Sequence, residues 1–230
     1  MTARIDRLWP DPAEHLTDEA MMDAVDHDGV RVNFVTSLDG AATRDGVSGA
    51  LGGAADERYF ALLRRVADVV VVGAGTVRAE GYGPMVVTAP RRGQPVFAIV
   101  SASLDLDPAS PVFTEAPVRP VLITTERASG KAAFREVAEV VVAGSSRVDG
   151  RRAVDALHTR GLRRILCEGG PALFGSLLAA DVVDELCLTV APTLESGDAP
   201  RISAGVAVAR GMTLASVLRS GSELLLRYRR

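Results

Sequence analysis

Lysine and histidine are scarce in this sequence, and each scarcity excludes a class of protein. Lys131 is the sole lysine beside 25 arginines, and the 29 acidic residues leave a net charge of −3. The arginines are spread along the chain and balanced by carboxylates, so the basic patch typical of nucleic-acid binding is missing. The three histidines, His15, His27 and His158, have no partners at ligand or triad spacing, which disfavours metal and serine-hydrolase chemistry.

Cysteine is scarce too, and long apolar runs are missing. Cys167 and Cys187 both lie in apolar segments, which predicts buried free thiols and disfavours a disulfide framework or a zinc site. No stretch approaches the length of a membrane span, and the first residues lead into acidic, proline-containing sequence instead of the apolar core of a signal peptide. With 47% hydrophobic and 24% charged residues, the chain is expected to be a globular protein of the cytoplasm.

Apolar strand segments alternate with helical segments along most of the chain. The predicted strands cover residues 30–38, 68–73, 96–100, 121–124, 139–143, 164–167 and 185–190. The predicted helices cover residues 56–67, 75–80, 131–137, 151–160 and 171–179. This alternation predicts an α/β fold with a mostly parallel sheet flanked by helices. Segments 212–218 and 223–228 predict an antiparallel hairpin at the C-terminal edge.

The domain organisation follows from the same pattern. Neither a repeat nor a low-complexity linker divides the chain, so residues 30–230 are expected to form a single domain. Residues 1–29 are more polar and are expected to be an N-terminal extension packed on that domain. Within the extension, Thr17 is a candidate N-cap of a short helix.

Three strand ends carry glycine or small polar residues, and in open α/β sheets ligands bind beyond the carboxyl ends of the strands. The first, Gly73-Ala74-Gly75-Thr76, opens like a dinucleotide-binding loop. Arg78 replaces the third glycine of that motif, however, and the acidic residue expected about twenty positions later is missing. The segment is therefore either a phosphate-binding turn or a turn that needs glycine for its backbone angles.

The other two strand ends also leave two interpretations open. Glu168-Gly169-Gly170-Pro171 precedes a helix whose N-terminus suits an anion, while the Glu168 carboxylate suits a ribose hydroxyl or a substrate N–H. The alternative is an ordinary strand-to-helix turn. The small-residue stretch 39–54 is either a mobile lid or a surface loop without a role.

Taken in order, Ser37-Leu38-Asp39-Gly40, the Gly73–Thr76 turn and the Glu168–Pro171 turn resemble the riboflavin-biosynthesis pyrimidine reductases. These form the reductase domain of the bacterial bifunctional deaminase–reductase. The resemblance runs from about residue 30 to the C-terminus and implies the dihydrofolate-reductase-like fold. No deaminase zinc motif is present, so we expect a reductase-only chain. The resemblance implies an NADPH-dependent, homodimeric oxidoreductase that transfers hydride to C1′ of 5-amino-6-(5-phosphoribosylamino)uracil or of its non-deaminated counterpart.

The resemblance also implies roles for individual residues. Cofactor contacts fall on Val35, Ala50, Gly73, Gly75, Thr76, Glu80, Ser101, Gly169, Gly170, Pro171, Ala172, Leu173 and Phe174. Ser101, with Ser103 as a second candidate, falls beside the adenosine 2′-phosphate. Substrate contacts fall on Asn33, Ser48, Arg64 and Glu168.

Two departures from the family change the substrate pocket. Asn33 replaces the family's lysine and removes a charge. Residues 80–87 lack the arginine that would bind a substrate 5′-phosphate, which leaves Arg91 or Arg92 of the adjacent loop as substitutes.

Asp56 begins the helix after the 39–54 stretch, where dihydrofolate reductases carry their pocket carboxylate. A carboxylic acid in an apolar pocket can have a raised pKa and supply the proton that reduction of a C=N bond needs, which makes Asp56 the candidate catalytic residue. The alternative role is that of an acid stabilising a helix N-terminus. Two other functions stay open: a reductase of dihydrofolate or another pteridine, and a non-catalytic nucleotide-binding sensor.

Overall fold

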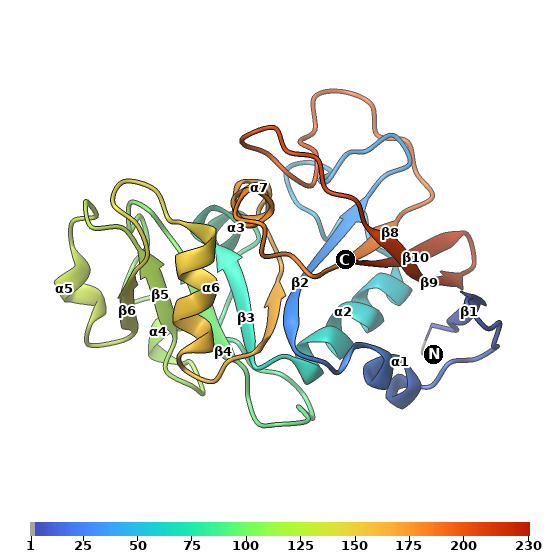
Figure 1. The fold of residues 1–230 in the computed structure, drawn as a ribbon, viewed down its shortest axis with the longest axis horizontal. Coiled ribbons are helices and arrows are strands. Elements are labelled where there is room, and N and C mark those ends of the chain that lie inside the picture. The colour runs from blue at the N-terminus through green and yellow to red at the C-terminus, as the bar shows by residue number, and fades with distance from the viewer. Residues whose placement is uncertain (1–2) are drawn as a thin grey trace.

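A single ten-stranded sheet runs through the computed structural model, which describes residues 3–230 (Figure 1). The strands are β1 (Asp6–Trp9), β2 (Gly29–Thr36), β3 (Val69–Gly73), β4 (Val96–Val100), β5 (Val121–Thr124), β6 (Glu139–Val142), β7 (Arg164–Cys167), β8 (Glu185–Val190), β9 (Thr213–Ser220) and β10 (Glu223–Arg229). The helices are α1 (Asp18–Val25), α2 (Ala54–Val66), α3 (Ala74–Ala79), α4 (Pro111–Thr114), α5 (Lys131–Phe134), α6 (Gly150–His158) and α7 (Pro171–Ala179).

The sheet order is β1-β9-β10-β8-β2-β7-β3-β4-β5-β6. The seven strands from β8 to β6 are parallel, and β10, β9 and β1 are antiparallel to their neighbours. The predicted α/β class with an antiparallel C-terminal hairpin is therefore confirmed. The sequence pattern did not predict β1 or the one-turn helix α4.

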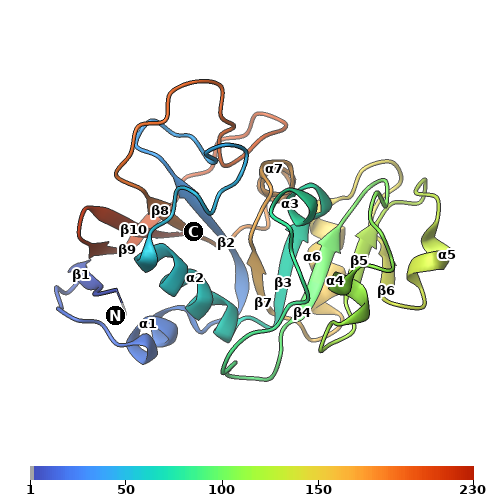
Figure 2. The same cartoon turned by 180° about the vertical axis from the view of Figure 1, so that it is seen from behind.

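Successive side chains of the central strands point to opposite faces of the sheet and form two hydrophobic cores, one on each face. In β3, Val70 and Val72 face α1 and α2, while Val69 and Val71 face α6 and α7. Figures 1 and 2 show these two helix layers from opposite sides. Because successive strand residues point to opposite faces, a run of four valines fills both cores and holds the sheet between its helices.

Residues 3–29 pack against the rest of the chain through both of their elements. β1 pairs with β9, and Met21, Met22 and Val25 of α1 enter the same core as α2. Thr17 caps α1 as predicted, since its side chain accepts a hydrogen bond from the backbone N–H of Ala20 at 3.2 Å. The first two residues of the predicted extension lie outside the described residues.

Two long loops, residues 37–53 and 191–212, stand side by side beyond the carboxyl ends of β2 and β8 (Figures 1 and 2). Leu38 donates its backbone N–H to the Thr193 carbonyl at 2.8 Å, and Arg44 pairs with Glu195. The Asp39 carboxylate accepts from the backbone N–H of Glu195 at 3.1 Å. These bonds join the two loops into one cover over the end of the sheet.

Cys167 and Cys187 are buried and free, as predicted. None of the helices within residues 3–230 combines the length and the apolar character that a membrane crossing needs.

Candidate active site

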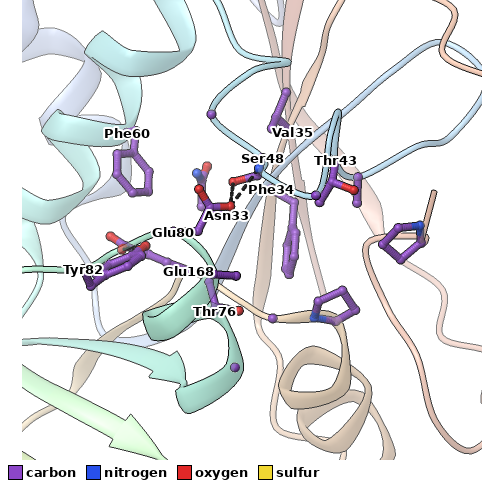
Figure 3. Close-up of a pocket in the computed structure, with 18 of the residues that line it drawn as sticks. Asn33, Phe34, Val35, Thr43, Ser48, Phe60, Thr76, Glu80, Tyr82 and Glu168 are labelled. Carbon is purple, nitrogen blue, oxygen red and sulfur yellow. Dashed lines mark hydrogen bonds between the residues drawn. The ribbon is translucent and has the colours of Figure 1, made fainter. Parts of the chain in front are cut away.

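A cavity of about 330 Å³, here called the central cavity, opens at the carboxyl ends of β2, β3 and β7 beneath the 37–53 loop (Figure 3). Parallel strands bring their carboxyl ends to one edge, so the three predicted strand ends meet there. The cavity is lined by Asn33, Phe34, Val35, Ala42, Thr43, Gly46, Ser48, Gly49, Asp56, Glu57, Phe60, Gly75, Thr76, Ala79, Glu80, Tyr82, Glu168, Gly170, Pro171 and Pro200.

Glu168, directly after β7, is the most firmly held carboxylate in the central cavity. Arg64 donates to both of its oxygens, each at 2.6 Å, and the Tyr82 hydroxyl donates to Oε2 at 3.0 Å. The Glu168 side chain is only 1% exposed, and the Arg64 guanidinium lies 4.2 Å from the centre of the Phe60 ring. A bidentate arginine fixes both position and charge, so Glu168 presents a rigid acceptor to a ligand N–H or O–H.

Asp56, in the first turn of α2, is a carboxyl whose protonation state depends on burial. Burial raises the pKa of Asp56 to about 6; a hydrogen bond from the Thr189 hydroxyl opposes this shift, and the nearby Glu223 carboxylate adds to it. Because Asp56 also lines the central cavity, it can hold a proton there near neutral pH.

The 37–53 loop is attached to α3 by a single carboxylate. The Ser48 backbone N–H and hydroxyl both donate to Glu80 Oε1, at 2.7 and 2.9 Å (Figure 3). This contact joins the loop to the end of α3 beside the central cavity, in addition to the bonds that join the loop to residues 191–212.

A larger cavity of about 600 Å³, here called the glycine cleft, lies between the carboxyl ends of β3 and β4 and the start of α7. Its walls are mostly glycine, alanine and serine, with two arginines. They comprise Gly73, Ala74, Gly75, Arg78, Val100, Ser101, Ala102, Ser103, Arg147, Val148, Gly150, Ala153, Ala172, Leu173, Gly175, Ser176, Ala179, Ala204, Gly205 and Val206.

The turns after β3 and β7 pack directly on each other beside the glycine cleft. Gly73 donates its backbone N–H to the Gly169 carbonyl at 2.8 Å, and a Cβ on Gly170 would lie 2.6 Å from Thr76 Oγ1. A side chain at Gly170 would therefore force the Thr76 hydroxyl to move, so glycine at this position allows the two turns to pack closely.

Most of the predicted cofactor residues line one of the two cavities. Val35, Thr76, Glu80, Gly170 and Pro171 line the central cavity; Gly73, Ser101, Ala172 and Leu173 line the glycine cleft; Gly75 lines both. Ala50, Gly169 and Phe174 line neither, and Phe174 instead stacks beneath Phe34 with ring centres 5.2 Å apart.

Among the predicted substrate residues, Asn33, Ser48 and Glu168 line the central cavity, whereas Arg64 lies behind Glu168. The expectation that Arg91 or Arg92 replaces the family's missing arginine is wrong. Both pair with Asp26 below the opposite end of the sheet, and neither lines the cavity. Acidic side chains near the amino ends of the parallel strands hold both arginines there.

Tyr82, Phe60, Thr189 and Arg147 join the site without having been predicted. Tyr82 lies in the 80–87 segment that departs from the family. The sequence signal that could have identified Tyr82 is an aromatic residue between two glycines. Thr189 and Arg147 carry no local signal, because only the tertiary structure brings Thr189 to Asp56 and Arg147 to the glycine cleft.

Comparison with known proteins identifies relatives with this architecture. The family model for the RibD C-terminal domain matches residues 29–226. A 2,5-diamino-6-ribosylamino-4(3H)-pyrimidinone 5′-phosphate reductase of Methanothermobacter thermautotrophicus is 35% identical over 173 residues, covering 73% of this chain and 79% of that protein. The crystal structure of a pyrimidine reductase-like protein from Corynebacterium diphtheriae superposes with a TM-score of 0.80 at 30% identity, covering 93% of this chain and 98% of that one.

A bifunctional enzyme shares the fold. The deaminase/5-amino-6-(5-phosphoribosylamino)uracil reductase of Thermotoga maritima has a TM-score of 0.67 at 22% identity. The match covers 88% of this chain and 56% of the Thermotoga chain.

Proposed function

The chain belongs to the RibD C-terminal domain family, and on that premise we propose that it is an NADPH-dependent pyrimidine reductase of riboflavin biosynthesis. The proposed reaction is hydride transfer to C1′ of 2,5-diamino-6-ribosylamino-4(3H)-pyrimidinone 5′-phosphate, the compound that names the Methanothermobacter relative, or of its deaminated form. One observation carries the proposal: a single cavity combines the two glycine turns with a rigid carboxylate, Glu168, and a protonatable one, Asp56.

The residues of the glycine cleft fit the cofactor. Small side chains and the free N–H groups at the start of α7 suit a pyrophosphate, while Arg78, Arg147, Ser101 and Ser103 suit a 2′-phosphate at the far end. Gly75 lines both cavities, so a dinucleotide in the cleft can extend toward the substrate. NADPH, when bound, supplies the hydride.

Glu168 and Asp56 have different roles in the proposed reaction. Glu168 is held in place by Arg64 and accepts hydrogen bonds from the substrate, which fixes the orientation of the substrate. During reduction of the opened ribosylimine, the C=N electron pair moves to nitrogen, and that nitrogen needs a proton. We assign that proton to Asp56, acting directly or through a water molecule.

The test is NADPH consumption by the purified protein with the ribosylaminopyrimidine phosphate, followed by mass spectrometry of the product. The proposal predicts a product that is two hydrogens heavier, with a ribityl chain in place of the ribose. Lack of turnover with both the diamino compound and its deaminated form would rule the proposal out.

Dihydrofolate is a second candidate substrate, favoured by the charge of the central cavity. Its lining within residues 3–230 holds four carboxylic acids, Asp56, Glu57, Glu80 and Glu168, and no lysine or arginine. A neutral pterin ring fits such a lining, and reduction of its C=N bond also needs one proton. NADPH consumption with dihydrofolate, lost in Asp56→Asn, would support this candidate.

We also propose that the protein is a cytoplasmic homodimer whose reductase domain covers residues 30–230. The family match from residue 29 supports this boundary, and the edge strands β1 and β6 offer two places for sheet edges to pair. Light scattering after size exclusion tests the assembly; a mass near 24.1 kDa, that of one chain, would contradict it.

A further inference from the structure

Asp56, the proposed proton donor, has a second carboxylate beside it at the start of α2. Glu223, the first residue of β10, is buried, and its Oε1 accepts the backbone N–H of Gly53 at 2.9 Å. Gly53 is the N-cap of α2, so Glu223 binds the chain three residues before Asp56. We propose that Glu223 is a positioning residue that acts on Asp56 through its charge. This inference rests on the proposed reductase function, which assigns the proton to Asp56.

The register of the sheet brings Glu223 to Asp56. β8 and β10 are antiparallel neighbours in which Thr189 lies directly opposite Leu225. Side chains directly opposite each other share a face, and so do side chains two positions apart, so Thr189, Leu225 and Glu223 point to one face of the sheet. Leu225 belongs there to the same hydrophobic core as Ala55 of α2. This face therefore lies beneath the first turns of α2 (Figures 1 and 2).

Each of the two carboxylates lies against one of two successive glycines. A Cβ on Gly52 would lie 2.2 Å from Asp56 Oδ2, and a Cβ on Gly53 would lie 3.3 Å from each carboxylate oxygen of Glu223. The Cα atoms of adjacent residues are about 3.8 Å apart. The two carboxyl groups are therefore close enough for their charges to interact.

Within residues 3–230, no cation is among the groups that act on the Asp56 carboxyl. These groups are the Thr189 hydroxyl from β8, the Glu223 carboxylate from β10 and the Glu57 carboxylate beside Asp56 on α2. Burial has the largest effect and raises the pKa of Asp56, the two carboxylates also raise it, and the Thr189 hydrogen bond lowers it. Glu57 is exposed and Glu223 is buried, so water screens the charge of Glu223 less. A neighbouring negative charge favours the protonated carboxyl, which is the form that the proposed reaction uses.

The experiment measures kcat against pH, with NADPH and the ribosylaminopyrimidine phosphate, in wild type, Glu223→Gln and Glu223→Asp. In Glu223→Gln, which keeps an acceptor for the Gly53 N–H, the pH at which kcat falls should move down by about 0.5–1 pH unit. This shift corresponds to a loss in kcat of about 3–10-fold at pH 7, with no loss at pH 4 and no change in KM. Glu223→Asp keeps the charge and should retain most of the wild-type profile. Glu136→Gln, an exposed acid outside the site, is the control and should leave the profile unchanged.

The same substitution in Asp56→Asn separates the effect of charge from a structural effect. If Glu223 acts through Asp56, adding Glu223→Gln to Asp56→Asn should leave kcat within about 2-fold of the single variant. If Glu223 only stabilises the start of α2, Glu223→Gln should lower kcat equally at every pH and with either residue at position 56. That result, or an unchanged pH profile in Glu223→Gln, would overturn the inference and leave the proposed function intact as long as the wild type is active.

A ¹³C NMR titration of the Asp56 carboxyl in the ligand-free proteins does not depend on turnover. The pKa of Asp56 should be lower in Glu223→Gln than in wild type by the amount that the kcat profile moves. If wild type turns over neither the diamino pyrimidine nor its deaminated form, the proposed function fails, and the NMR titration alone decides the inference. The same pKa of Asp56 in wild type and in Glu223→Gln would overturn it.

Discussion

At the scale of single residues, Asp56 combines an energetic cost with a chemical use. Its folded-state pKa, about 6, lies above the ordinary 3.8, so between these values the folded protein binds more protons than the unfolded chain. Stability from this group is complete below about pH 4 and is lost as pH rises through about 6. An ionised Asp56 at this partly buried position therefore destabilises the protein at pH 7.

We expect Asp56→Asn to raise the free energy of unfolding at pH 7 by about 1–3 kcal/mol and to lower kcat roughly 100-fold. Urea denaturation at pH 7 and at pH 4 checks the first part, because the gain should vanish at the lower pH. Wild-type kcat should fall as pH rises through about 6. The exposed Asp155→Asn on α6 is the control. Loss of stability in Asp56→Asn, with kcat unchanged, would instead identify Asp56 as a stabilising acid at a helix N-terminus.

The pair of Arg64 and Glu168 behaves differently, because each charge depends on the other. Arg64→Gln leaves a carboxylate that is 1% exposed without its cation, so we expect a loss of about 3 kcal/mol in the free energy of unfolding. Adding Glu168→Gln removes the unpaired charge and should regain most of that loss. Urea denaturation of both single variants and the double variant measures the coupling. Additive losses would mean that the two side chains do not depend on each other.

At the scale of elements, the position of the 191–212 loop depends on a glycine of α7. A Cβ on Gly175 would lie 1.9 Å from the Ala204 carbonyl oxygen, and Ala204 donates its N–H to the Pro171 carbonyl at 3.0 Å. Both Ala204 and Gly175 line the glycine cleft. The loop can therefore cover the cleft only while residue 175 has no side chain.

Gly175→Ala should displace this loop, lower the free energy of unfolding by about 1–3 kcal/mol and weaken NADPH binding. Calorimetric titration with NADPH measures the binding. Gly211→Ala, where a Cβ meets nothing within 4 Å, is the matched control. The same Kd for NADPH in both variants would show that the loop does not shape the cofactor site.

The elements that the sequence predicts correctly are those whose signal is local. The valines of β3 form a continuous β-branched run, and the predicted helices that match α2 and α6 each carry an apolar face of their own. β1 fails this condition, because Asp6–Trp9 precedes Pro10 and gains its partners from β9, more than 200 residues later. α4 is one turn long and too short for a periodic pattern, and the helix predicted over 131–137 is likewise a single turn that ends at Phe134.

The same difference between local and long-range signals applies to the residues of the site. The turns at Gly73 and Glu168 were predictable because glycines follow directly at the ends of two apolar strand segments, where ligands bind in open α/β sheets. The residues that bond to the carboxyl groups of the site were not predictable from the sequence. Thr189 of β8 bonds to Asp56, and Tyr82 of the chain after α3 bonds to Glu168; sequence spacing does not encode either contact.

At the scale of the whole molecule, the proposed cofactor would contact segments that lie far apart in the sequence. The glycine cleft is formed by segments after β3 and β4, by the start of α7 and by the 191–212 loop. A ligand that binds only the folded protein stabilises all of these segments together, and at 100 times Kd the gain is about 2.7 kcal/mol. For a chain of 230 residues, NADPH should raise Tm by roughly 5–10 °C.

The size of the rise in Tm should depend on the 2′-phosphate of the cofactor. Arg147 lines the glycine cleft and forms no hydrogen bond or ion pair within residues 3–230, whereas Arg78 already donates to the Asp105 carbonyl at 2.6 Å. Arg147 is thus the freer cation for a phosphate. At equal concentrations, NADH should raise Tm less than NADPH, and Arg147→Gln should reduce the NADPH rise to the NADH value without changing Tm of the ligand-free protein. Equal rises with both cofactors in the wild type would mean that the cleft does not recognise the 2′-phosphate. An NADPH preference that survives in Arg147→Gln would instead assign that recognition to Ser101, Ser103 and Arg78.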